Sequence, residues 1–159
     1  MRAGASRAPA TRSSSDGVRI RLRNVSEPPQ RNLVLILARS FASRLATAVF
    51  LVDAEGTVIY FNEAAEELLG QRFIEGAGMR VEEYTKLFEP TTPEGERIRP
   101  LETPIGLAIS ELEPVHAELT LRGADGVVRP IAATAFPLLA HAGEPVGAIA
   151  IFWERSESG

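Results

Sequence analysis

Apolar and polar residues alternate most clearly over residues 115–122, which predicts a strand with one buried face. Its apolar side would carry Val115, Ala117, Leu119 and Leu121, and its polar side His116, Glu118, Thr120 and Arg122. Four further apolar runs predict strands over residues 48–52, 57–61, 127–138 and 146–153. The last run is apolar on both sides, so we expect other elements to cover both faces of that strand.

Helical spacing of apolar residues occurs before and between these strands. It predicts a helix over residues 32–46 with Asn32 as its cap, and a short helix over residues 63–69 capped by Asn62. One or two turns are expected over residues 81–88, and a further helix over residues 102–112. The order helix, two strands, short helices, three strands predicts one α+β domain.

Charge divides the chain into two parts. Residues 1–31 hold seven arginines and two acidic residues, a net charge of +5, whereas residues 32–159 hold ten basic and nineteen acidic residues, a net charge of −9. We therefore predict a basic, mostly disordered arm over 1–31, a folded domain over 32–155 and a short tail over 156–159. Within the arm, residues 18–22 alternate apolar residues with arginine, which is a strand signal. The acidic domain is not expected to bind nucleic acid.

Two absences exclude further classes of protein. The chain has no cysteine, which rules out disulfides, thiol catalysis and cysteine-based metal sites. No stretch of 18 apolar residues occurs, because Arg39 and Arg44 interrupt the most apolar segment. We therefore expect no membrane insertion and a cytoplasmic location.

Residues 49–70 resemble the opening of a PAS domain. The family pattern there is an apolar strand, Asp-x-x-Gly, a second apolar strand, Asn, and then x-Ala-x-x-x-Leu-x-Gly. This chain matches it with Asp53, Gly56, Asn62, Ala64, Leu68 and Gly70. The residues 118–122, 125–126, 137–138 and 147–149 resemble the last three strands of the same family. The resemblance implies a five-stranded antiparallel sheet with short helices between strands two and three and an N-terminal capping helix.

The resemblance also implies a non-enzymatic sensory or regulatory module of bacterial signal transduction. Many relatives continue after the last strand through Asp-Ile-Thr into a signalling helix, whereas this chain has Trp153, Glu154 and Arg155 there. Output is therefore expected in trans, through the N-terminal helix, an oligomer interface or a separate signalling protein. The alternative to a sensor is a ligand-free docking module. A small isomerase using Glu102 or Glu118 in an apolar pocket is a third alternative.

In this family a small pocket lies between the sheet and the short helices. Ala132, Ala133 and Ala135 are small where a central strand usually carries bulky residues, which leaves room for a ligand. The predicted lining residues are Phe88, Leu107, Leu119, Ala133, Ala135 and Ala150. In the alternative, Phe88, Leu107 or Phe136 fills this space, because native cores keep few voids.

The ligand itself is not identified by the sequence, but two cofactors are disfavoured. Flavin-binding light sensors of this family carry Asn-Cys-Arg-Phe-Leu-Gln, and the chain has Gln71-Arg72-Phe73 without the cysteine, so no cysteinyl-flavin adduct can form. Haem-binding relatives use a histidine on the helix before the third strand, and residues 102–112 contain none. His116 and His141 are expected at the surface, and no metal site is expected.

The predicted N-terminal helix has a second apolar side. Val34, Leu35, Ala38, Phe41, Ala42 and Leu45 share one arc, while Leu33, Ile36 and Leu37 point away from it. In PAS proteins this helix often packs against its copy, which implies a homodimer whose interface includes Leu33, Ile36, Leu37 and Trp153. The alternative is that residues 18–25 fold back over this side.

Overall fold

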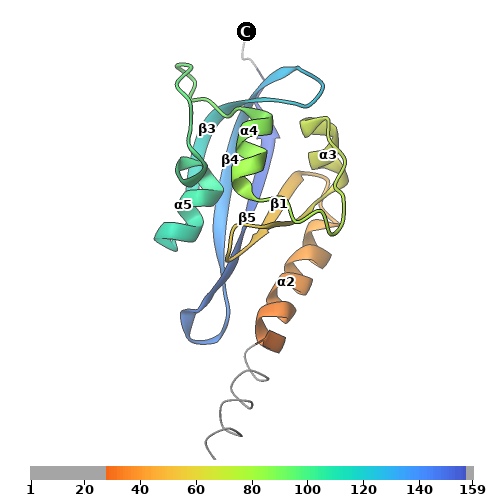
Figure 1. The fold of residues 1–159 in the computed structure, drawn as a ribbon, viewed down its shortest axis with the longest axis vertical. Helices are drawn as coiled ribbons and strands as arrows, with labels where there is room; N and C mark the ends of the chain where they lie inside the picture. Colours follow the sequence, from red (N-terminus) through yellow and green to blue (C-terminus); the bar gives the residue numbers. More distant parts are fainter. Residues whose placement is uncertain (1–27, 157–159) are drawn as a thin grey trace, which may run out of the picture.

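The computed structural model describes residues 28–156, so the predicted strand over 18–22 and the alternative contact of 18–25 lie outside the described residues. The fold is α+β, and its elements follow the predicted order (Figure 1). They are α2 (Pro28–Ala42), β1 (Ala48–Asp53), β2 (Val58–Phe61), α3 (Glu63–Leu69), α4 (Val81–Phe88), η1 (Pro100–Glu102), α5 (Pro104–Glu111), β3 (Val115–Arg122), β4 (Val128–Leu139), η2 (His141–Gly143) and β5 (Pro145–Glu154).

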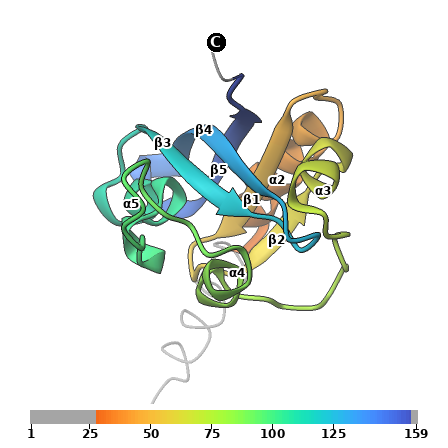
Figure 2. The same cartoon turned by 90° about the horizontal axis from the view of Figure 1, so that it is seen from above.

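The five strands form one antiparallel sheet in the order β2-β1-β5-β4-β3. The last strand of the chain, β5, is therefore central. Helices α3, α4 and α5 lie on one face of the sheet, called here the inner face, and α2 lies on the other, the outer face (Figures 1 and 2). This arrangement confirms the predicted sheet, the short helices and the capping helix.

Both faces of β5 are covered over residues 148–152, as its two-sided apolar pattern predicts, whereas Trp153 next to them is 43% exposed. Ala148, Ala150 and Phe152 belong to the inner core together with side chains of α3, α4 and α5. Ile149 belongs to a separate outer core, in which half-buried residues of α2 and its following turn pack on β1. Because side chains alternate along a strand, one five-residue segment joins the two cores.

Helix α2 differs from its predicted bounds at both ends. It begins at Pro28, four residues before Asn32, and proline is compatible with the first turn of a helix. It ends at Ala42, four residues earlier than predicted, where the backbone tightens into turns in which Leu45 N donates to Ala42 O. Phe41, expected on the inward arc, is 57% exposed. The helix contacts the sheet through a narrower stripe than its apolar content predicts.

Candidate functional site

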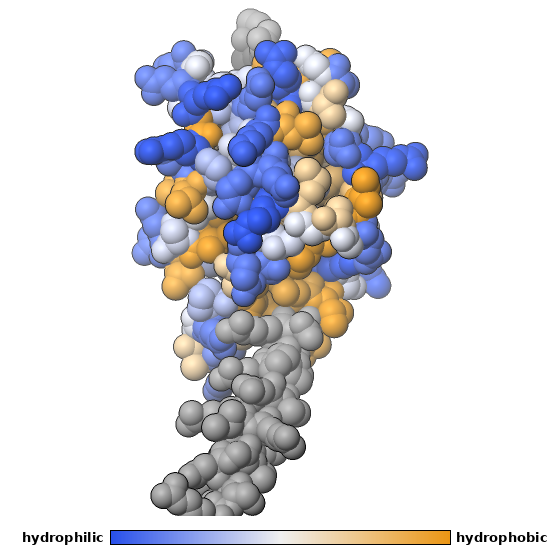
Figure 3. Space-filling view, viewed as in Figure 1, coloured by the Kyte–Doolittle hydropathy of each residue, from blue (hydrophilic) through white to orange (hydrophobic). Residues whose placement is uncertain are grey.

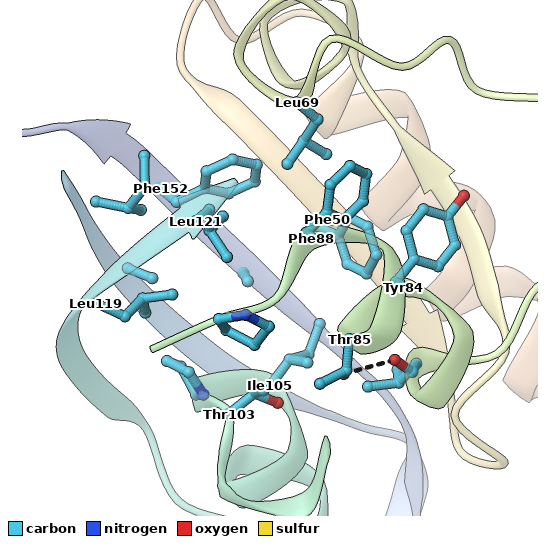
Figure 4. Close-up of a pocket in the computed structure, with 16 residues that line it drawn as sticks. Phe50, Leu69, Tyr84, Thr85, Phe88, Thr103, Ile105, Leu119, Leu121 and Phe152 are labelled. Atoms are coloured by element: carbon cyan, nitrogen blue, oxygen red, sulfur yellow. Dashed lines mark hydrogen bonds between the residues drawn. The ribbon is translucent and has the colours of Figure 1, made fainter. Parts of the chain in front are cut away.

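A cavity of about 110 Å³ lies between the inner face of the sheet and the helices α4 and α5 (Figure 4). Every strand except β2 contributes to its wall, as do the last residue of α3, the whole length of α4 and the start of α5. Sixteen residues line it: Phe50, Leu69, Val81, Tyr84, Thr85, Phe88, Pro90, Thr103, Pro104, Ile105, Leu119, Leu121, Ile131, Ala133, Ala150 and Phe152.

Four of the six predicted lining residues are in this wall, namely Phe88, Leu119, Ala133 and Ala150. Leu107 does not line the cavity; Ile105 of the same helix does, and two residues along a helix turn a side chain by about 200°. Ala135 does not line it either. It lies one pleat further along β4, between its partners Val115 and Ala150, where it is completely buried.

The expected filler Phe136 does not enter the cavity. Side chains alternate between the two faces along β4, and Ala133 points to the inner face, so Phe136, three residues further on, points to the outer face. Its side chain is 39% exposed. The space beside Ala133 therefore stays open. Phe152 also lines the cavity and was not among the predicted lining residues. It lies two residues after Ala150 on β5, and this spacing is the sequence signal that assigns both side chains to the same face.

An aromatic cluster forms one side of the cavity. The Tyr84 ring meets the Phe50 ring edge-on, with 5.2 Å between centroids, and stacks on the Phe88 ring at 5.6 Å. The Tyr84 hydroxyl points away from the cavity (Figure 4). Burial raises the pKa of this phenol, and the neighbouring charge of Glu83 raises it further. Tyr84 therefore contributes a neutral ring face to the wall.

The remaining polar side chains of the wall are two threonines, and both hydroxyls already have partners. Thr85 Oγ1 donates to the carbonyl of Val81 at 2.7 Å, the bond drawn in Figure 4. Thr103 Oγ1 donates to the carbonyl of Pro100 at 2.7 Å and accepts from Gly106 N at 3.2 Å, which caps α5. Neither hydroxyl has a free donor hydrogen for a ligand.

The titratable side chains considered from the sequence lie elsewhere. Glu102 is exposed and pairs with Arg99 at 2.6 Å, which lowers the pKa of its carboxyl through this hydrogen bond. Glu118 is on the outer face and pairs with Arg155 at 3.0 Å. His116 and His141 are both exposed. Within residues 28–156 no group of three acidic or histidine side chains is placed to hold a metal ion.

The outward side of α2 is apolar and exposed. Leu33, Ile36, Leu37 and Phe41 are each more than half exposed, and we call them the α2 stripe. In Figure 3 apolar side chains gather at the lower end of the molecule, over this helix, whereas the upper part is mostly hydrophilic. Trp153 is 43% exposed near the other end of α2, where it helps to line a shallow hollow with Ala46 and Thr47. In the described part of the chain, none of the helices is long and apolar enough to cross a membrane.

Comparison with known proteins identifies the family. No curated protein matches the chain. Similar solved structures include the PAS domain of a protein from Colwellia psychrerythraea, with 19% identity, a TM-score of 0.56, and coverage of 78% of this chain and 98% of that one. The Rhodobacter sphaeroides LOV protein has 16% identity, a TM-score of 0.59, and coverage of 81% and 70%. The PAS domain of nitrogen regulation protein NR(II) from Vibrio parahaemolyticus has 15% identity, a TM-score of 0.52, and coverage of 75% and 98%.

At these identities the solved structures show a common fold and nothing finer. The family model described as PAS fold matches residues 42–158, which is most of the chain and includes every strand and the helices α3, α4 and α5. This chain belongs to the PAS-fold family.

Proposed function

We propose that this PAS domain is a cytoplasmic, non-enzymatic sensory module of signal transduction. In this proposal a small molecule occupies the inner cavity and alters how α2 is presented to a partner. The observation that carries it is the central strand β5. Ala150 and Phe152 line the cavity, while Ile149 and Ile151, which alternate with them, pack in the outer core with α2. A ligand that displaces β5 would therefore also move the side chains on which α2 packs.

The chemistry of the wall supports sensing over catalysis. The lining residues include no carboxylate or histidine, and the two candidate bases, Glu102 and Glu118, are in surface ion pairs. General acid–base catalysis needs such a group within hydrogen-bond reach of the reacting atoms. Two of the similar structures are named as a nitrogen regulation protein and a LOV protein, which favours a regulatory role, including one in two-component signalling.

The proposal is tested by native and denaturing mass spectrometry of the freshly purified full chain, followed by hydrogen exchange. We expect a non-covalent small molecule that is lost on denaturation, and slower or faster exchange in α2 when it is bound. A protein that carries no small molecule, and takes up none from a cell extract, would contradict the proposal. So would a bound molecule that leaves exchange in α2 unchanged.

A second candidate function, homodimerisation, is favoured by the α2 stripe. Its residues have the spacing i, i+3, i+4 and i+8, which forms one continuous side of a helix. No charged side chain lies within it, so the same stripe on a second copy of this chain is complementary to it in an isologous pair. Trp153 adds exposed apolar surface near the other end of the helix. We therefore propose a homodimer centred on Leu33, Ile36 and Leu37.

The dimer is tested by light scattering after gel filtration of the full chain. We expect the mass of a dimer for the unmodified protein and of a monomer for Ile36→Asp, with Leu33→Asp as a second disrupting variant. Ser43→Asp is the control, because Ser43 is exposed just beyond α2 and outside the stripe. If both stripe variants keep the mass of the unmodified protein, α2 is not part of the dimer interface.

A further inference from the structure

The size of the inner cavity limits its occupant. An apolar cavity of about 150 Å³ binds benzene or xenon in a model protein, and pockets for drug-sized ligands span about 300–1,000 Å³. The cavity of this domain is about 110 Å³. It therefore matches a single small ring or a short branched chain.

The walls limit the chemistry of the occupant as well. None of the lining residues carries a charge, and the hydroxyls of Thr85 and Thr103 already donate to backbone carbonyls. The Tyr84 hydroxyl points away from the space (Figure 4). The surface that the wall turns towards the cavity is almost entirely apolar. A charged or strongly hydrogen-bonding molecule would therefore lose its water on entry and gain little in return, which is unfavourable.

Two features of the wall favour a ring in particular. The rings of Phe50, Tyr84 and Phe88 lie along one side, and aromatic rings attract one another in edge-on and offset arrangements. At Ala133 and Ala150 the sheet side of the wall has only a methyl group, so the volume that a larger side chain would fill at these two positions is empty. The space exists because the sequence places alanine at these two positions of adjacent central strands.

From these three observations we infer that the cavity takes a compact, uncharged, apolar molecule of about the size of benzene, with a monocyclic aromatic hydrocarbon as the best match. The inference rests on the proposed sensory function and adds the class of ligand. It assigns recognition to shape and apolar contact, without any ion pair or hydrogen bond to a side chain of the wall.

The first test compares three rings of similar size on the full chain: benzene, phenol and benzoate. The methyl resonances of Ala133 and Ala150 are followed by NMR during each titration. We expect benzene to shift both resonances saturably, with phenol binding at least tenfold more weakly and benzoate leaving the resonances unchanged. Tighter binding of benzoate or phenol than of benzene, or no response to benzene, would overturn the inference.

The second test fills the space. Ala150→Leu places three extra carbon atoms in the cavity and is expected to weaken benzene binding at least tenfold while the protein stays folded. Ala133→Val makes a smaller change at the neighbouring strand and should weaken binding less. The control is Ala132→Leu, which adds the same atoms at an equally buried alanine on the outer face, between Glu118 and Trp153. Equal binding by all three variants would place benzene outside the cavity and overturn the inference.

The two proposals fail in different ways. If mass spectrometry finds a polar or charged molecule in the cavity, the ligand class is wrong and the sensory function stands. If benzene binds at Ala133 and Ala150 but hydrogen exchange in α2 does not respond, the ligand class stands and the sensory coupling fails.

Discussion

The side-chain amide of Asn62 donates to the backbone carbonyl of Ala42, the last residue of α2, over 3.1 Å. The same nitrogen is 3.2 Å from the carbonyl of Leu45 and 2.8 Å from that of Thr47, so two hydrogens are shared among three acceptors. The side-chain oxygen accepts from Val49 N at 2.9 Å and Ala65 N at 3.1 Å. One buried side chain thus joins the end of α2, the start of β1 and the first turn of α3.

This junction lies between the two parts of the domain that the proposed function connects. On the inner side, α3 ends at Leu69, which lines the cavity. On the outer side, α2 carries the exposed stripe. Because Asn62 is 3% exposed, water does not compete for its hydrogen bonds, and these bonds connect the first turn of α3 to the end of α2.

Replacing Asn62 is expected to destabilise the domain strongly. Asn62→Ala leaves the buried N–H groups of Val49 and Ala65 without their acceptor, and each unsatisfied buried group costs about 1–3 kcal/mol. Asn62→Asp keeps that acceptor but turns a second oxygen towards three carbonyls, so it should also be destabilising. Urea denaturation measures the free energy of unfolding, with Glu63→Gln, an exposed neighbour, as the control. Stability within about 0.5 kcal/mol of the unmodified protein for both variants would contradict the role of the junction.

Gly106, in α5, is expected to resist substitution by alanine. Alanine is favoured over glycine within a helix by about 1 kcal/mol. A Cβ atom at this position would, however, lie 2.3 Å from the carbonyl oxygen of Pro100 and 2.8 Å from the Cα atom of Leu101, both backbone atoms of η1. Because neither atom can turn aside, we expect Gly106→Ala to lose about 1–3 kcal/mol of stability.

The measurement for Gly106→Ala is again the free energy of unfolding in urea. Ser110→Ala, at an exposed position of the same helix, is the matched control and should be neutral or slightly stabilising. A gain in stability from Gly106→Ala would show that η1 and α5 are not packed against each other as described.

The ion pair of Asp125 with Arg129 predicts part of the response to acid. The Arg129 guanidinium donates to the carboxylate at 2.7 Å, and this hydrogen bond is the main reason why the pKa of Asp125 falls from 3.8 to about 2. A lowered pKa means that the unfolded chain takes up a proton at a pH where the folded chain does not. The stability supplied by this carboxylate is therefore present above about pH 4 and is lost as the pH falls through about 2.

The test compares the unmodified protein with Asp125→Asn by urea denaturation at several pH values. At pH 7 we expect the variant to be less stable, and the difference between the two proteins should shrink as the pH falls from 4 towards 2. Glu94→Gln, which removes another exposed acidic charge, is the control. A difference between the Asp125 proteins that stays constant over this range would contradict the assignment.

The local pattern of the sequence was sufficient to predict the order of the elements and most of their bounds. Residues 63–69, 81–88 and 115–122 form α3, α4 and β3 at the predicted positions. Each is defined by the spacing of its own side chains, and α3 is also defined by its caps, Asn62 before it and Gly70 after it. The two-sided apolar pattern of β5 likewise indicated a strand covered on both faces, because the pattern states what the strand must bury.

Only the tertiary structure decided the features that depend on residues far apart in sequence. Helix α2 ends at Ala42 and not at residue 46. At Ala42 the side-chain amide of Asn62, twenty residues further along the chain, donates to the terminal carbonyl of the helix. Phe41 is exposed because the position of α2 on β1 and β5 limits which side of the helix is buried. Ile105 lines the cavity in place of Leu107 because of the way α5 is rotated about its axis against the sheet. Phe136 does not fill the cavity because its side chain lies on the outer face of β4. Periodicity identifies the face that a residue occupies, whereas the space left beside that face depends on how all the packed elements meet.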